Sequence, residues 1–253
     1  MTGQINSYPE LPSLITELLG FFPNNGLLRF LEHWQNVFYS LIAIAILSIF
    51  AYRATRKTAL IPDRLQAFAE ILVGGLDDFV CGILGKEGRR YTPFIGTLFI
   101  YILTMNILGL VPFMKSATAS WSTTMALGLC VFFYVQYTGI RSMGFFGYLD
   151  HLAGRPRKAL AFTVVLPLLL FAVHVITELI RPISLSLRLR SNIWGDDLLL
   201  AVLAGFGLRG LPLLVLNTLS GLLVSVIQAV VFCLLSTIYF ALILTHQEEE
   251  KVR

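Results

Sequence analysis

Charged residues are scarce in this chain. Asp, Glu, Lys and Arg make up 13% of its 253 residues and apolar residues 56%, whereas a soluble globular domain has about 25% charged residues. Several apolar stretches reach the roughly 20 residues that a helix needs to cross a bilayer, and the short alternating segments of an outer-membrane barrel are missing. The sequence therefore predicts an all-α membrane protein.

Cysteine is rare as well, and a nucleotide-binding motif is absent. The three cysteines, Cys81, Cys130 and Cys233, lie far apart without metal-ligand spacing, so we expect neither a disulfide framework nor a metal site. We predict that all three are small buried apolar residues. Because no glycine-rich phosphate-binding loop occurs, we expect a non-catalytic chain without a cofactor. The net charge of +4 fits basic membrane edges better than a nucleic-acid surface.

The apolar pattern predicts about five transmembrane helices plus an interfacial helix. The stretch 63–85 contains polar residues and has basic segments on both sides, which favours a helix along the membrane interface. The last two spans are longer than ~30 Å of hydrocarbon requires, so they must be strongly tilted or protrude. The five spans are expected at about 36–53, 93–112, 121–141, 159–206 and 212–245.

Basic residues at the membrane edges predict the orientation. They follow the first span and separate the third span from the fourth, and such residues gather on the cytoplasmic side. The N-terminus is then outside and the C-terminus cytoplasmic, with 1–35 as an outer segment and 36–253 as a single membrane domain. Since the start of the chain lacks the pattern of a signal peptide, we expect a multi-pass protein of a bacterial plasma (inner) membrane.

One arginine stands in the middle of the fourth predicted span. Arg188 has no carboxylate three or four residues away, and an ionised side chain at membrane depth costs at least ~2.5–3.5 kcal/mol on insertion scales. Arginine does not escape this cost by losing its proton. Its partner must therefore come from elsewhere in the protein or from another chain, which makes Arg188 the leading functional residue.

The same helix carries further polar residues near Arg188. Residues seven apart share a helix face, so His174 and Arg181 line up with Arg188, and Asn192 follows one turn later. Each has a structural alternative. Arg181 precedes a proline and would end or kink the helix there, Glu178 would pair with Arg181, and His174 would be a packing residue.

The remaining polar residues lie on the opposite face and on the last helix. Arg190 points away from Arg188 and would either snorkel, pair with Asp197, or stabilise it in an ion path. On the last helix Gln228 would be either a partner for Arg188 or interhelical glue worth ~1 kcal/mol. Because eleven residues make about three helical turns, four residues of that helix form one stripe: Asn217, Gly221, Gln228 and Tyr239.

Two motifs resemble a known family. The segment Arg181-Pro-Ile-Ser-Leu-Ser-Leu-Arg188-Leu-Arg-Ser-Asn192 resembles the signature of the a subunit of the F-type ATP synthase membrane (Fo) sector, and Asn106-Ile-Leu-Gly-Leu-Val-Pro112 is similar to its second motif. Gln228 and Tyr239 also stand where the last helix of that family has Gln and Tyr. The resemblance runs from about residue 36 to 245.

The resemblance implies a function and roles for individual residues. The family's a subunit is a proton-conducting stator with two half-channels that faces a rotating c-ring of small proteolipids, beside b-type peripheral stalk subunits and lipid. Arg188 matches the essential arginine, and four further residues match path positions: Asn192, Asp197, Gln228 and His174. The secondary candidates are Arg190, Glu178, Tyr239 and Asn217. Arg190-Ser191 and Gly221 depart from the family pattern, and the choice of H⁺ or Na⁺ stays open.

Two other function classes remain. A secondary ion transporter also places charge at mid-membrane, but we find no internal repeat of the kind that such folds use. A structural membrane scaffold explains the helices but not Arg188. Dependence of proton conductance on a co-purifying ring of small proteolipids separates the three classes.

Overall fold

The computed structural model describes residues 34–56, 62–111, 120–152 and 165–251, together with the single residues 30, 114 and 118. Most of the predicted outer segment 1–35 lies outside the described residues. The same holds for four basic residues on which the predicted orientation depends: Lys57, Arg155, Arg157 and Lys158.

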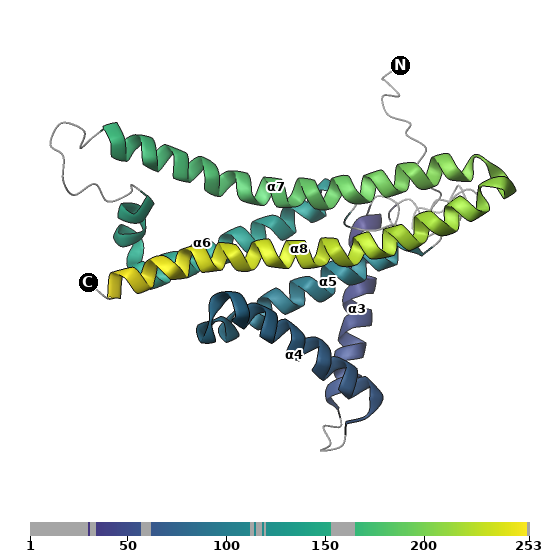
Figure 1. The fold of residues 1–253 in the computed structure, drawn as a ribbon, viewed down its shortest axis with the longest axis horizontal. Coiled ribbons are helices and arrows are strands. Elements are labelled where there is room, and N and C mark those ends of the chain that lie inside the picture. Colours follow the sequence, from purple (N-terminus) through teal and green to yellow (C-terminus); the bar gives the residue numbers. More distant parts are fainter. Residues whose placement is uncertain are drawn as a thin grey trace.

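Every regular element in the described ranges is a helix, as the composition predicts (Figure 1). Two short 3₁₀ helices, η1 (Lys86–Arg90) and η3 (Gly207–Gly210), connect longer ones. The six α-helices are α3 (Gln35–Thr55), α4 (Arg64–Leu84), α5 (Thr92–Leu110), α6 (Trp121–Leu152), α7 (Val165–Ala204) and α8 (Leu211–Lys251).

Four of these helices are long and apolar enough to cross a membrane. They are α3, α5, the part Trp121–Ser142 of α6 and the part Leu211–Leu244 of α8. Helix α7 is not among these four of the described helices, so the fifth span stays a prediction. With 40 and 41 residues, α7 and α8 are each about 60 Å long at ~1.5 Å per residue. This is twice the hydrocarbon thickness, so in a membrane each of them has to tilt strongly, curve or protrude.

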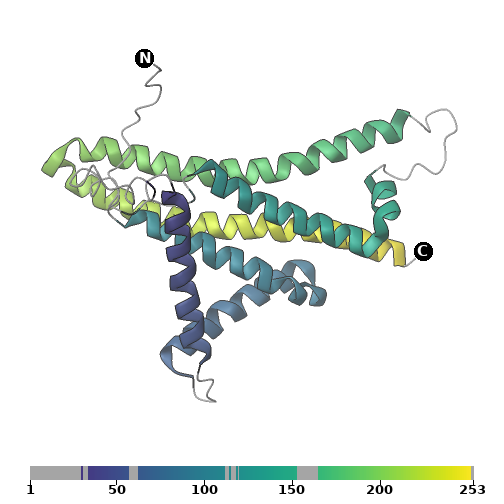
Figure 2. The same ribbon diagram turned by 180° about the vertical axis from the view of Figure 1, so that it is seen from behind.

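The two long helices form an antiparallel hairpin along the long axis of the molecule, and α5 and α6 pack against it (Figures 1 and 2). Aromatic side chains from α5, α6 and α8 hold the crossing together. The rings of Phe94 and Tyr134 lie 4.5 Å apart, and the ring of Tyr91 stacks on Phe240 at 4.8 Å. Such pairs contribute about 0.5–1.5 kcal/mol beyond their burial.

Helix α6 approaches α7 unusually closely at Gly128. A Cβ atom at Gly128 would lie 2.8 Å from the Pro182 carbonyl oxygen and 2.7 Å from the Ser186 Oγ. The Ser186 hydroxyl is shared between the Thr124 carbonyl of α6, at 3.0 Å, and the Pro182 carbonyl, at 2.7 Å. The missing side chain of Gly128 therefore permits the contact that fixes α6 beside the proline turn of α7.

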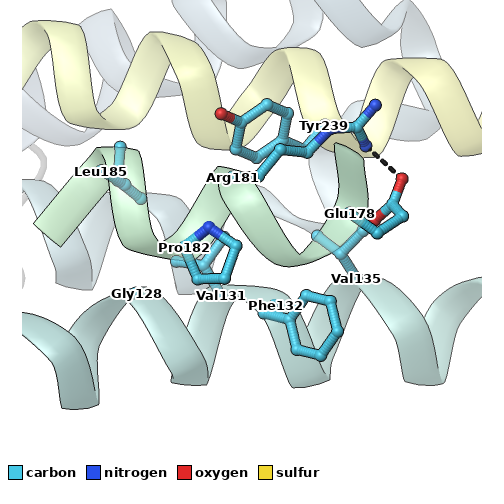
Figure 3. A pocket seen from close by; sticks show the side chains of 9 residues that line it. All are labelled: Gly128, Val131, Phe132, Val135, Glu178, Arg181, Pro182, Leu185 and Tyr239. Atoms are coloured by element: carbon cyan, nitrogen blue, oxygen red, sulfur yellow. Dashed lines mark hydrogen bonds and ion pairs between the residues drawn. The ribbon is translucent and has the colours of Figure 1, made fainter. Parts of the chain in front are cut away.

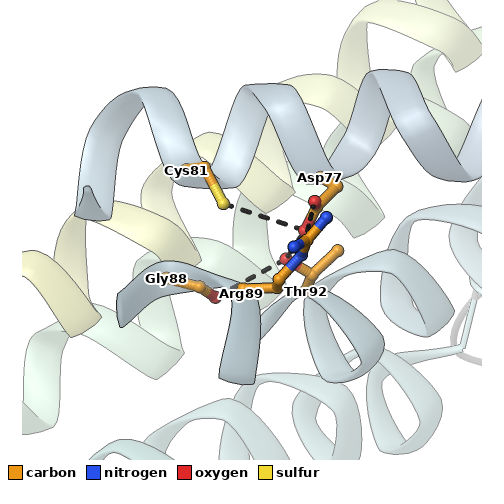
Figure 4. Close-up of polar contacts among 5 residues, drawn as sticks. All are labelled: Asp77, Cys81, Gly88, Arg89 and Thr92. Carbon is orange, nitrogen blue, oxygen red and sulfur yellow. Dashed lines mark hydrogen bonds and ion pairs between the residues drawn. The ribbon is translucent and has the colours of Figure 1, made fainter. Parts of the chain in front are cut away.

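Helix α4 is anchored by one carboxylate at its junction with η1 and α5 (Figure 4). Asp77 accepts hydrogen bonds from the Thr92 hydroxyl at 2.8 Å and from Arg89 Nε at 3.2 Å, and a weak one from Cys81 Sγ at 3.7 Å. The Thr92 hydroxyl and then the Arg89 guanidinium hold the pKa of Asp77 below its ordinary value, because both stabilise the ionised carboxylate.

Two sequence-based expectations need correction. The alternative that the helix ends at Arg181 is wrong, because α7 continues through Pro182, as the predicted span 159–206 does; prolines are tolerated in membrane helices where neighbouring groups satisfy the backbone. The predicted third span, 121–141, agrees with the apolar part Trp121–Ser142, and helix α6 itself runs on to Leu152 across a break at Gly144 with φ 72°. The cysteines are not all buried: Cys233 is, but Cys130 is exposed and Cys81 is partly exposed.

Candidate functional site

The best-defined polar group in the hairpin is centred on Glu178 (Figure 3). Glu178 forms the predicted ion pair with Arg181 one turn on, and Gln136 Nε2 of α6 donates a hydrogen bond to its other carboxylate oxygen at 2.9 Å. The Arg181 guanidinium lies over the ring of Tyr239 of α8, 5.0 Å from its centroid. Three helices thus bring their polar groups to one place.

These residues border a small pocket between α6, α7 and α8 (Figure 3). Its walls are mostly apolar, and the Glu178 and Arg181 side chains, 16% and 20% exposed, form a charged edge. The charge of this edge is balanced, so it is stable at membrane depth in a way that a lone carboxylate is not. The pocket is lined by Gly128, Val131, Phe132, Val135, Glu178, Arg181, Pro182, Leu185 and Tyr239.

Arg188 lies on the outer surface of α7, in contrast to the half-buried Arg181. Its neighbours Leu185 and Leu189 face the core, at 2% and 0% exposure, whereas Arg188 and Leu187 are exposed. Within the described part of the chain Arg188 has neither an ion pair nor a hydrogen bond. A permanent cation therefore stands on an apolar surface without an anion from the described residues of its own chain.

The stripe predicted on α8 faces the interior. Gln228 is 7% exposed and Asn217 9%, with Gly221 buried between them. Neighbouring polar groups of α5 extend the stripe, because Asn106 Nδ2 donates to the Ser225 carbonyl at 3.5 Å. The Thr118 hydroxyl in turn donates to Asn106 Oδ1 at 3.1 Å.

The remaining candidate residues of α7 do not form one group. His174 is exposed one turn before Glu178, and Asn192 and Asp197 are half-buried. The guanidinium of Arg190 lies 5.7 Å from the ring centroid of Trp121 of α6, which is within the range of a cation–π contact.

Sequence reasoning missed two residues that the fold brings to these groups. Gln136 binds Glu178 across 42 residues of sequence; a clue was present, since it is the one Gln in the apolar run 121–141. Asp196 also lies half-buried on α7, facing α8 at Gly221. The sequence pattern indicated the adjacent Asp197 and not Asp196.

Comparison with known proteins agrees with the motifs. The family model described as ATP synthase A chain matches residues 37–241. The ATP synthase subunit a of Protochlamydia amoebophila is 42% identical over 97% of this chain and 93% of its own length. The subunit of Solidesulfovibrio magneticus is 39% identical over 84% of this chain and 85% of its own, and that of Helicobacter pylori 35% identical over 81% and 87%.

The match covers the motif helices, the glutamate pocket and most of the α8 stripe in one continuous segment. It also decides between the three function classes that the sequence left open, since neither a secondary transporter nor a scaffold gives this agreement over most of the chain. The chain belongs to the ATP synthase A chain family, the non-catalytic, multi-pass, proton-conducting stator subunits of the Fo membrane sector.

Proposed function

We propose that Arg188 is the fixed cation of this stator and that it faces a rotating c-ring of small proteolipids, each carrying a carboxylate in the membrane. The observation that carries this proposal is the exposed, unpaired position of Arg188 on an apolar surface. That surface includes Ile180, Ile183 and Leu187, all at least 38% exposed. An exposed apolar patch that carries a permanent charge is suited to a partner that supplies the opposite charge.

The chemistry follows from the permanent charge of arginine. A rotor carboxylate must be neutral while it faces lipid, because ionisation there is costly. When it comes within about 4–6 Å of Arg188, the cation lowers its pKa by roughly 1–3 units, so the carboxylate releases its proton. Arg188 also repels a free proton, which keeps protons from crossing without turning the ring.

Two polar groups on either side of Arg188 support two half-channels. One contains Glu178, His174 and Tyr239. The other is centred on Asn192. Glu178 and Asp197 lie about 28 Å apart along α7 at ~1.5 Å per residue, with Arg188 near the midpoint. Because α7 is tilted, their separation along the membrane normal is smaller than this distance, and both fit within ~30 Å of hydrocarbon. The further residues of the second group are Asp197, Asn217 and Gln228, with Arg190 at its edge.

The proposed setting is a bacterial plasma membrane with the N-terminus outside and the C-terminus cytoplasmic. The Glu178 group then opens to the cytoplasm, and the Asn192 group opens to the outside through the α7–α8 connection. Each proton that crosses 100 mV delivers ~2.3 kcal/mol, which the ring converts into rotation. We place b-type peripheral stalk subunits beside this chain, because a stator must be held against that torque.

The test is substitution of Arg188 in the assembled enzyme, with ATP-driven acidification of inverted vesicles as the readout in sodium-free buffer. We expect Arg188→Ala to abolish pumping while the complex still assembles. Arg188→Lys should also fail, because an ammonium is more strongly hydrated and lacks the planar fork. Arg53→Ala, a change of an exposed cation in the last turn of α3, is the control and should pump normally. Normal pumping by Arg188→Ala would overturn the proposal.

A further inference from the structure

A second carboxylate next to the predicted Asp197 points into the hairpin. Asp196 is half-buried on α7, and its Oδ2 lies 3.8 Å from the place that a Cβ atom of Gly221 would occupy on α8. Leu110 of α5 closes the other side, with its Cδ2 2.8 Å from that same place. The Asp196 carboxylate thus lies within van der Waals distance of the place that a side chain at residue 221 would occupy, and Leu110 fills part of that place because residue 221 is glycine.

Asp196 has no ionic or hydrogen-bonding partner in the part of the chain that the structure describes. This separates it from Glu178, whose charge is balanced by Arg181 and Gln136. Even a half-buried carboxylate is costly to ionise without a partner, so Asp196 must either be reached by water or hold a proton. A hydrated carboxylate and a neutral carboxylic acid are the two states between which a proton-carrying group alternates.

Polar side chains of α8 lie on both sides of the level of Asp196, and one of them is near the level of Arg188. Asn217 and Gln228 lie on the buried side of α8, on either side of Gly221 along the helix. Because α7 and α8 are antiparallel, Asn217 lies nearer the connection between them, and Gln228 lies nearer the level of Arg188. Polar groups thus precede and follow Asp196 on one route.

We propose that, within the proton path proposed above, Asp196 is the proton carrier beside Gly221. A proton that enters past Asn217 binds the Asp196 carboxylate and forms the neutral acid. The acid then releases the same proton toward Gln228 and the rotor carboxylate, which restores the Asp196 carboxylate. The step is a proton relay without a net change of charge on the chain.

Isosteric substitution tests this role. Asp196→Asn keeps the shape but carries no proton, and we expect the assembled enzyme to hydrolyse ATP in detergent while its ATP-driven pumping falls roughly tenfold or more, within the range of lost proton-transfer groups. Asp196→Glu should restore most of the flux. A merely structural role predicts instead that Asn serves as well as Glu. Pumping by Asp196→Asn at the wild-type rate overturns the inference.

A second variant keeps the inference testable if Asp196→Asn fails to assemble. Leu110→Cys, in a background with alanine at Cys81, Cys130 and Cys233, keeps Asp196 intact and places a thiol at the space beside Gly221. We expect Ag⁺ ions to stop proton flux through this variant and to leave the alanine background unaffected. Flux that persists with Ag⁺ overturns a proton path past Asp196. The inference rests on the proposed function, and the two fail differently: normal pumping by Arg188→Ala removes both, whereas normal pumping by Asp196→Asn alone removes only Asp196.

Discussion

Gly128 of α6 lies against the backbone of Pro182 of α7, and a Cβ atom at Gly128 would stand 2.8 Å from the Pro182 carbonyl oxygen. The obstacle is main chain rather than the end of a flexible side chain, so it does not move without shifting α7. Because α7 also carries Arg188 and Glu178, the position of both depends on this glycine.

We therefore predict that Gly128→Ala destabilises the protein by about 1–3 kcal/mol, the usual cost of overpacking, and lowers its thermal midpoint in detergent. Gly82→Ala is the matched control: Gly82 lies in helix α4 with nothing within 4 Å of an added Cβ, so it should leave the midpoint unchanged or raise it slightly. Equal midpoints for Gly128→Ala and the control would show that α6 and α7 are not in close contact here.

The hydrogen bond from Gln136 to Glu178 gives a second prediction. Gln136→Leu removes the donor and places an apolar group beside the carboxylate, so we expect several-fold slower ATP-driven proton flux with normal assembly. Gln66→Leu, which removes a comparable Gln–Glu contact within α4, should not change the flux. Unaltered flux in Gln136→Leu would take Glu178 out of the proposed path.

The register of the hairpin gives a third prediction. Asp196 lies opposite Gly221, and seven residues back on α7 and forward on α8 this register places Leu189 opposite Gln228. Both are buried, whereas Ile227 is 51% exposed. We expect cysteines at Leu189 and Gln228 to crosslink on oxidation more readily than cysteines at Leu189 and Ile227.

The control for this crosslink is a pair at a distant register. Cysteines at Leu189 and Leu216, in the same cysteine-free background, should stay reduced, because Leu216 lies near the α7–α8 connection. Crosslinking of this control pair with none at Gln228 would show that the two helices are aligned differently.

The Asp77 junction predicts a dependence of stability on pH. Its pKa lies below the ordinary carboxyl value in the folded state, chiefly because of the Thr92 hydrogen bond and then Arg89. A lowered folded pKa stabilises the protein above the unfolded pKa of ~3.9, and this contribution disappears as the pH falls through the folded value. Asp77→Asn should therefore lower the thermal midpoint at pH 7, and the difference from wild type should shrink below pH 4.

Asp78→Asn is the neighbouring control for this effect. Asp78 is exposed on the same helix, and its loss should give similar midpoints at both pH values. A difference between wild type and Asp77→Asn that stays constant from pH 7 to pH 3 would contradict the assignment of the effect to ionisation.

Features that depend on neighbours in the sequence could be predicted from it. The ends of α4 fall within one residue of the predicted 63–85, and the Glu178–Arg181 pair follows from helical spacing. The stripe of Asn217, Gly221 and Gln228 is buried on one side of α8, as its period indicates. In these cases helical periodicity within one segment is enough to predict the observed structure.

Features that depend on how distant helices meet could not be predicted. The partners Gln136 for Glu178 and Trp121 for Arg190 come from α6, and no periodicity within one helix indicates which neighbour it will contact. The exposure of Cys130 shows the same limit, since an apolar helix does not by itself tell which side faces out.

The exposed position of Arg188 links the order of assembly to the stability of this chain. Inserted alone, the subunit holds a permanent cation against acyl chains, at a cost of about 2.5–3.5 kcal/mol. An adjacent carboxylate of a partner removes that cost, and every 1.4 kcal/mol is a factor of about ten in an equilibrium. Under the proposed function, the chain should therefore fold most completely when it is inserted beside a ring that already exists, and a solitary copy should be the less persistent form in the membrane.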